Sequence, residues 1–183
     1  ERIILPEMSD EFRQFLIETA RSGYGAYDAV PERHSDGRSR LTYQNDNFIS
    51  EDIWRGGYPF SGQQTVSVYT GEGTDTRDIW QMNYRGNIFS PEFTPEDMRK
   101  WYQRVLTDPD EAMPIRGQQL VCERGDEYSL QVKGTLSDFI ATERIRRKGV
   151  RGSLYVARFA GGLIGHQLGE EQGSPIWLKP PEV

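Results

Sequence analysis

The stretch Phe60–Val66 reads Phe-Ser-Gly-Gln-Gln-Thr-Val, and the stretch Phe139–Ile145 reads Phe-Ile-Ala-Thr-Glu-Arg-Ile. Both follow the two-residue period of a β-strand that has one buried face. Each begins with phenylalanine, has a small residue at its third position and a polar residue at its fifth, and ends on a branched aliphatic residue. This echo predicts two copies of one strand-rich unit.

The echo continues along the chain on both sides of these stretches. Downstream, Trp80-x-Met82-x-Tyr84-x-Gly86-x-Ile88 is matched by Tyr155-x-Ala157-x-Phe159-x-Gly161-x-Leu163. Upstream, a glycine precedes each phenylalanine, at Gly56 and at Gly134. The spacing between copies is too long for a solenoid of short repeats, so it favours two units related by a pseudo-twofold axis.

Two helices are predicted from their end signals. The first begins at the Ser9 cap and ends near Gly23, because a hydroxyl suits the start of a helix and glycine suits its end. The second opens on Thr94–Asp97, which reads Thr-Pro-Glu-Asp, and stops at Asp108. A capping hydroxyl, a first-turn proline and two acids are typical of a helix N-terminus.

Six strands are predicted, and the segment 28–47 reads as a loop because it is polar and lacks a period. The strands cover 49–57, 61–70, 77–86, 126–134, 138–148 and 151–161, with turns at Gly71–Gly73 and Gly149. The predicted fold class is α+β, built from two pseudo-repeats. Each repeat is a helix followed by an antiparallel three-stranded meander, with the helices packed on sheet. Residues 1–165 form this single domain, with repeats at about 9–90 and 94–165, and 166–183 form an irregular tail.

Composition narrows the function classes. The 183 residues carry a net charge of −6, which disfavours direct nucleic-acid binding. The single cysteine, Cys122, excludes an internal disulfide and fits a reducing compartment. No stretch approaches the roughly 20 apolar residues that span a membrane. We therefore expect a cytoplasmic protein that does not contact membranes.

Polar residues occur in the middle of strand faces that are otherwise apolar. Gln64 and Glu143 hold the same place in the two echoing stretches, and burial of a lone carboxylate is costly. Either these residues hydrogen-bond the sheet to neighbouring loops, or they line the bottom of a cleft between the two repeats that binds a small polar ligand. Candidate partners of Glu143 are Tyr84, Arg116, Tyr128 and Arg158. The full predicted ligand-binding set is Asp52, Trp54, Gln64, Trp80, Tyr84, Arg116, Tyr128, Glu143 and Arg158.

Catalytic and metal-binding signatures are weak in this sequence. It has no Gly-x-Ser-x-Gly elbow and no phosphate-binding Gly-x-x-x-x-Gly-Lys loop. His34 and His166 lack a second histidine or cysteine at metal-binding spacing, and Cys122 lacks an identifiable base. We predict no catalytic residue, no metal site and no cofactor.

A basic cluster surrounds the predicted turn at Gly149. Its members are Arg144, Arg146, Arg147, Lys148 and Arg151. These charges either protect a strand from edge-to-edge pairing, or they form a docking surface for nucleic acid or an acidic partner.

The motifs, taken as a set, resemble a known family. Ser50-x-Asp52-x-Trp54-x-Gly56, the strand motifs beginning at Phe60 and Trp80, Arg116-Gly117 and Phe159-x-Gly161-Gly162 are similar to an uncharacterised bacterial family, domain of unknown function 5680. The resemblance covers roughly residues 10–165. This chain has Gln64 where that family usually has Glu, and Ser50 where it usually has Tyr.

That resemblance implies a domain that occurs alone or fused behind a helix-turn-helix DNA-binding domain of the Xre type, and by association a sensing role. We favour a non-enzymatic module that senses a small ligand or binds a protein. One alternative is a hydrolase that uses inward carboxylates such as Asp52 and Glu143, with Arg116 as an anion clamp. The other is a structural domain that forms a homodimer.

Overall fold

The computed structural model describes residues 9–26, 28–70 and 75–164. Helix α1 covers Asp10–Ser22, and the Ser9 side chain accepts a hydrogen bond from the Phe12 amide at its start. Helix α2 covers Pro95–Leu106, and Thr94 and Asp97 bond to each other's backbone amides in a capping box. Both predicted helices are confirmed. Their starts can be predicted from the sequence because each depends on the chemistry of a few adjacent residues.

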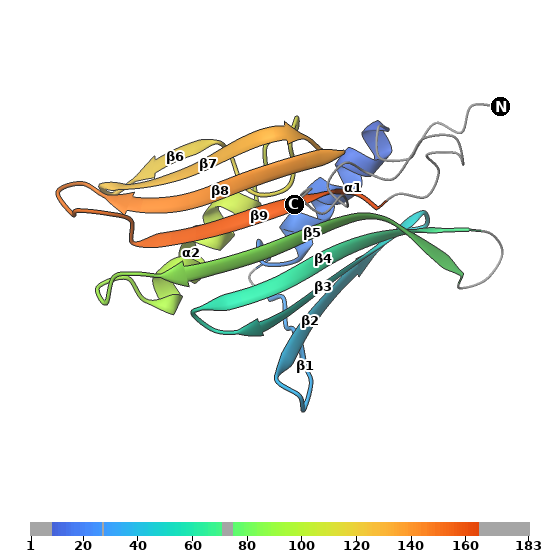
Figure 1. Cartoon of the computed structure of the whole chain (residues 1–183), viewed down its shortest axis with the longest axis horizontal. Coiled ribbons are helices and arrows are strands. Elements are labelled where there is room, and N and C mark those ends of the chain that lie inside the picture. The colour runs from blue at the N-terminus through green and yellow to red at the C-terminus, as the bar shows by residue number, and fades with distance from the viewer. Residues whose placement is uncertain (1–8, 27, 71–74, 165–183) are drawn as a thin grey trace, which may run out of the picture.

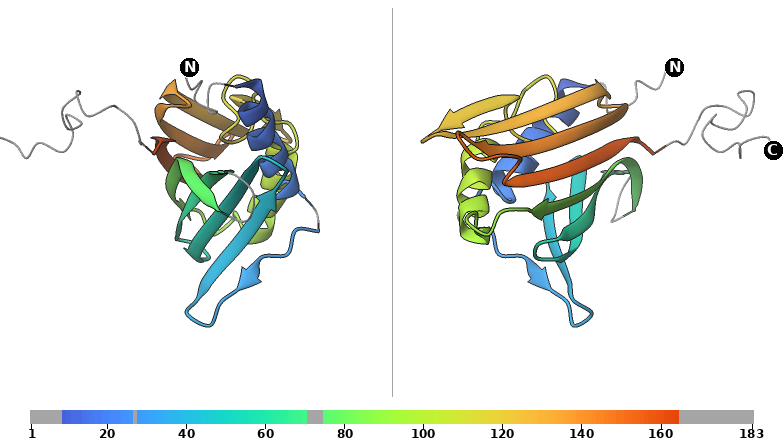
Figure 2. Two further views of the ribbon diagram at one scale, coloured as in Figure 1. Left: turned by 90° about the vertical axis from the view of Figure 1, so that its right-hand side faces the viewer. Right: turned by 60° about the vertical axis from the view of Figure 1, so that its left-hand side comes forward.

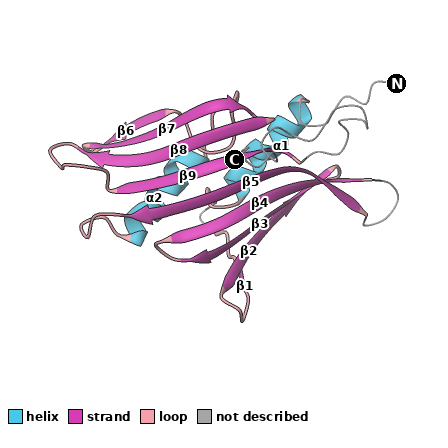
Figure 3. Cartoon of the chain, viewed as in Figure 1, coloured by secondary structure: helices cyan, strands magenta, loops and turns pink. Residues whose placement is uncertain are grey.

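Nine strands form one antiparallel sheet in the order β1-β2-β3-β4-β5-β9-β8-β7-β6 (Figures 1 and 3). The first five are β1 (Glu32–Arg33), β2 (Arg38–Gln44), β3 (Phe48–Gly56), β4 (Phe60–Tyr69) and β5 (Thr76–Ile88). After α2 come β6 (Leu120–Glu123), β7 (Asp126–Thr135), β8 (Asp138–Arg147) and β9 (Tyr155–Leu163).

The predicted fold class of two helix-plus-meander repeats, each with three strands, is wrong. A meander of five strands and a meander of four strands are joined into one sheet, because β5 pairs with β9 from Trp80↔Leu163 to Ile88↔Tyr155. That ladder hydrogen-bonds the backbone groups that two separate three-stranded sheets would leave unpaired at their edges.

The prediction of a loop over 28–47 is also wrong, and β6 was missed. β1 and β2 lie within that segment, and β2 pairs with β3 along its whole length. The hydrogen bonds that pair strands come from the backbone, so a polar sequence without a clear period can still form a strand. The predicted turn at Gly71–Gly73 and the predicted tail lie outside the described residues.

Both helices lie against the same face of the sheet (Figure 2). On the α1 side the Phe12 ring contacts Phe48 of β3 and Trp80 of β5. On the α2 side Trp101 stacks on Tyr128 of β7, with ring centroids 6.2 Å apart. Alternate strand residues therefore point into one aromatic core, while their neighbours face away from the helices. No helix in the described part of the chain is long and apolar enough to cross a membrane.

Aromatic rings cover glycines on neighbouring strands of the helix-facing side. Gly62 of β4 pairs with Tyr84 of β5, and a β-carbon on Gly62 would lie 2.4 Å from the tyrosine hydroxyl oxygen. Phe60 covers Gly86 in the same way, since a β-carbon there would lie 2.5 Å from the phenylalanine ring. These close approaches hold both rings flat along the sheet, at the edge of the site described below.

The basic cluster near Gly149 lies at the hairpin between β8 and β9. Arg147 donates two hydrogen bonds to Asp126, at 2.7 and 2.9 Å, and Arg144 donates one to Gln131. Gly149 has a φ of 82°, as a turn glycine requires. The docking role of this surface stays a prediction.

Candidate functional site

A cavity of about 200 Å³ lies between the helix-facing side of the sheet and the segments that cover it. Its aromatic lining residues are Tyr24, Trp54, Tyr58, Phe60, Tyr84, Tyr102 and Phe159. The other lining residues are Asp52, Gly56, Gly57, Gln64, Met82 and Arg116. The walls come from β3, β4 and the loop between them, from β5, β9 and α2, and from the residues after α1 and the loop before β6. This apolar pocket with a few polar groups has the composition typical of a small-molecule site.

Asp52 is the acidic group of this cavity. It lies in β3, and its Oδ1 accepts a hydrogen bond of 2.5 Å from the Tyr84 hydroxyl. Among the described residues, Tyr84 makes the one hydrogen bond to this carboxylate, and the other oxygen, Oδ2, is open to the cavity rather than buried without a partner. Burial raises the pKa of Asp52 to about 6, against the smaller lowering effects of Tyr84 and Arg116. The carboxyl group is therefore poised to change charge near neutral pH.

We expect the free energy of unfolding to depend on Asp52 between pH 4 and 6. The folded state keeps the Asp52 proton up to a pKa of about 6, whereas the unfolded chain loses it near 3.8, so stability falls as pH rises through this window. The Asp52→Asn variant lacks this loss. The free energy of unfolding of Asp52→Asn minus that of the wild type should therefore rise by about 2 kcal/mol between pH 4 and pH 8.

Urea unfolding of both proteins at several pH values measures that difference. Subtracting one plot of unfolding free energy against pH from the other removes the contribution of every other titrating group. A gap between the curves that stays constant from pH 4 to pH 8 would contradict the raised pKa.

Arg116 and Glu143 form a buried ion pair beside the cavity. The Arg116 Nε donates to Glu143 Oε1 at 3.2 Å, and its Nη2 donates to Oε2 at 3.4 Å. The Glu143 side chain is 0% exposed and the Arg116 side chain 12% exposed. Burial alone would lower the pKa of Arg116, but the carboxylate beside it raises that pKa well above the usual range. Arg116 therefore stays charged.

Three tyrosines complete the hydrogen bonding of this pair. The Tyr128 hydroxyl donates to Glu143 Oε1 at 2.7 Å, and the Tyr155 hydroxyl donates to Oε2 at 3.0 Å. The Tyr102 hydroxyl of α2 lies 2.7 Å from that of Tyr155. Burial raises the pKa of Tyr128 and of Tyr155 well above the ordinary value, so both remain neutral donors. Each oxygen of Glu143 thus meets a guanidinium and a hydroxyl.

The loop before β6 brings Arg116 to this position. Gly117 packs directly on α2, since a β-carbon there would lie 2.5 Å from the Val105 side chain. A backbone bridge between Pro109 and Gly117 closes the loop. The Arg116 guanidinium carbon then lies 4.8 Å from the ring centroid of Tyr102 and 5.2 Å from that of Phe159. The two rings and the Glu143 carboxylate together hold the cation in place.

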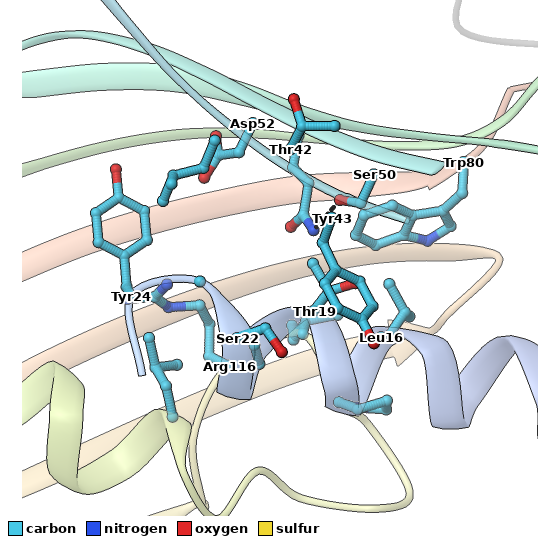
Figure 4. Close-up of a pocket in the computed structure, with 17 residues that line it drawn as sticks. Leu16, Thr19, Ser22, Tyr24, Thr42, Tyr43, Ser50, Asp52, Trp80 and Arg116 are labelled. Atoms are coloured by element: carbon cyan, nitrogen blue, oxygen red, sulfur yellow. Dashed lines mark hydrogen bonds between the residues drawn. The ribbon is translucent and has the colours of Figure 1, made fainter. Parts of the chain in front are cut away.

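A smaller cavity of about 70 Å³ continues from the first toward α1. Figure 4 shows Tyr24, Asp52 and Arg116 at one end of it and Trp80 at the other. Gln64 lines both cavities and donates a hydrogen bond of 2.9 Å to the Ser50 hydroxyl.

Five of the nine residues predicted for a ligand site lie together in the larger cavity: Asp52, Trp54, Gln64, Tyr84 and Arg116. Tyr128 and Glu143 lie in the adjoining ion-pair cluster, where Glu143 is fully buried. Trp80 is a core residue that lines only the smaller cavity. The cavity lies between the sheet and the segments over it, and its lining draws on both predicted repeats, with Tyr102, Arg116 and Phe159 from the second.

Arg158, the ninth residue, lies on the other face of the sheet. Its neighbours in β9, Ala157 and Phe159, are buried, whereas Arg158 is exposed. Alternation along the strand separates it from Glu143, so Arg116 alone among the predicted arginines pairs with that carboxylate. The regular spacing of Tyr155, Ala157 and Phe159 was a sequence signal that could have excluded it.

Sequence reasoning missed several residues of the cavity. They are Tyr24, Tyr58, Phe60, Met82, Tyr102 and Phe159. Tyr102 carried a usable signal, because it shares the apolar face of α2 with Met98 and Val105 while having a hydroxyl. Tyr24 carried none, since it lies in the irregular turn after α1.

The sequence profile of a family described as "Domain of unknown function (DUF5680)" matches residues 52–164, which is more than half of the chain. The chain belongs to this family. The DUF5680 match begins at Asp52 and includes the Arg116–Glu143 pair, whereas Tyr24 lies before it. No match was found among curated proteins or among solved structures.

No group of histidine, cysteine and acidic side chains suited to a metal ion occurs in the described part of this DUF5680 chain. His34 lies 3.7 Å from Glu32 at the sheet edge, and Cys122 is exposed in β6. His166 lies outside the described residues.

Proposed function

We propose that this protein is a module that binds and senses a small molecule in the 200 Å³ cavity. One observation carries the proposal: Asp52 presents a carboxylate oxygen that no described donor bonds, inside a pocket lined by aromatic rings. This oxygen is open to the cavity, so it can accept a hydrogen bond from a molecule bound there. The volume of the cavity is below the roughly 300 Å³ of sites for drug-sized ligands, which favours a small metabolite.

Rigid walls support the proposal. Tyr24 packs on Trp54 with ring centroids 5.1 Å apart, and Phe60 packs on Tyr84 at 6.0 Å. Tyr84 in turn rests on Gly62 and bonds to Asp52. Walls already ordered in the free protein lose little entropy when a ligand binds.

The hydrolase alternative receives less support. A general acid or base must reach the substrate, but Glu143 is 0% exposed and both of its oxygens are occupied by Arg116, Tyr128 and Tyr155. Arg116 is likewise committed to Glu143 and not free to clamp an anion.

The methyl group of Met82 offers a direct test, because Met82 lines the cavity and Met98 lies in the core at 0% exposure. The probes are choline, its neutral carbon analogue 3,3-dimethylbutan-1-ol, and the anion 3,3-dimethylbutanoate. We expect at least one of them, at millimolar concentration, to shift the ¹³C-methyl NMR signal of Met82 and leave that of Met98 unchanged.

A cavity-blocking variant controls for binding elsewhere. Gly57 lines the cavity, and a β-carbon on it would meet no atom within 4 Å, so a side chain can be added there and Gly57→Leu should narrow the site. The Met82 shift should then shrink or vanish. A Met82 signal that none of the three probes moves would refute the proposal, as would a shift that Gly57→Leu leaves intact.

A further inference from the structure

The charges around the cavity do not balance. Arg116 is neutralised by Glu143, with which it makes two hydrogen bonds. Asp52 has no cation within hydrogen-bond distance among the described residues, and its one bond comes from the neutral Tyr84 hydroxyl. With all three groups ionised, the site carries one uncompensated negative charge. The complementary ligand is therefore a cation.

The walls of the cavity also suit a cation. Aromatic faces attract positive charge through their quadrupole, most strongly in a pocket that excludes water. Tyr24, Trp54 and Tyr84 all line the cavity together with Asp52. Arg116 illustrates the same effect beside it, with its guanidinium over the rings of Tyr102 and Phe159. A strongly hydrated metal ion would gain little from such walls, whereas an organic ammonium group would bury its methyl or methylene groups against them.

We propose that the cavity binds a small organic cation, an amine or a quaternary ammonium compound, whose charge pairs with Asp52 and lies among the rings of Tyr24, Trp54 and Tyr84. This inference rests on the proposed ligand-binding function and names its ligand class.

The affinity should depend on pH through Asp52. The charged or titratable groups that face it are Tyr84 of β5, Tyr24 after α1 and Arg116 of the loop before β6. Burial raises the pKa of both tyrosines, and Arg116 stays charged, so none of the three changes charge between pH 5 and 8. Since the pKa of Asp52 is about 6, affinity for a permanent cation should fall about tenfold per pH unit below 6 and level off above 7.

Choline and 3,3-dimethylbutan-1-ol separate charge from shape, because they differ by one quaternary nitrogen in place of carbon. Titrations followed by the Met82 methyl signal at pH 7.5 should give choline at least about tenfold tighter binding than the alcohol, with 3,3-dimethylbutanoate the weakest. Asp52→Asn should weaken choline about tenfold or more and leave the alcohol within about twofold. The control Asp138→Asn, at an exposed carboxylate of β8, should change neither.

Trp54→Leu provides a second variant that keeps Asp52 intact, and we expect it to weaken choline more than the alcohol. Binding of the alcohol or the anion as tight as that of choline would overturn the cation inference while leaving the proposed function in place. So would choline affinity that is unchanged by Asp52→Asn or independent of pH between 5 and 7. Failure of all three probes to move the Met82 signal would overturn both.

Discussion

Replacement of Glu143 with alanine should lower the free energy of unfolding by about 3–5 kcal/mol. The change removes the carboxylate from a 0% exposed position and leaves the Arg116 guanidinium, at 12% exposure, without its counter-ion. It also leaves the hydroxyls of Tyr128 and Tyr155, which both donate to Glu143, without a hydrogen-bond acceptor. Urea unfolding monitored by tryptophan fluorescence measures the loss.

Two further variants show whether the buried charge causes this effect. Glu111→Ala, in the exposed part of the loop before β6, should change stability by less than about 0.5 kcal/mol. The double variant Glu143→Leu with Arg116→Met removes both charges and should be more stable than Glu143→Ala alone, because no unpaired ion remains. A Glu143→Ala protein as stable as the wild type would show that Arg116 finds another partner or reaches solvent at little cost.

Trp80→Ala should cost about 3–5 kcal/mol of stability, because it empties a large volume at the centre of the core. Trp80 is 0% exposed, stacks on Phe139 with ring centroids 5.9 Å apart, and donates from Nε1 to the Leu136 carbonyl at 2.9 Å. Trp80→Phe keeps most of the packing and should cost less, about 1–2 kcal/mol, for the lost hydrogen bond.

Trp54→Ala is the matched comparison, since the sequence placed both tryptophans in the ligand site. Trp54 is half-buried at the cavity and packs on the Tyr24 ring, so its loss should cost about 1–2 kcal/mol. Thermal and urea unfolding of the two variants should therefore rank Trp80 far above Trp54. Equal losses would mean that Trp54 belongs to the core and that the cavity wall is part of the packed interior.

The helices and most strands could be predicted because their signals are local. The capping box of Thr94 and Asp97 marks the start of α2, and alternation located β4 and β8 to within one residue of each end. The predicted strand 151–161 begins at Tyr155 instead, because the turn glycines Gly149 and Gly152 extend the hairpin. β1 and β6 went unrecognised because strands of two and four residues are too short to show a period, and β2 because its residues are mostly polar.

The site was predicted in part for the same reason. Asp52, Trp54, Gln64 and Tyr84 share a cavity because strand alternation puts them on one face, and alternation can be read from the sequence. Tyr24 and Phe159 reach the cavity from opposite ends of the chain; alternation gives the inward direction of Phe159, but no local pattern shows that it meets Tyr24.

The amino-acid sequence alone determined the helix caps and the choice of which strand side chains face inward. Both depend only on residues that are close together in the chain. Tertiary structure alone decided that β5 pairs with β9, that Glu143 pairs with Arg116 rather than with Arg158, and that Asp52 keeps an unpaired oxygen in a cavity. Each of these depends on segments far apart in the chain, whose meeting is set by the packing of the whole core.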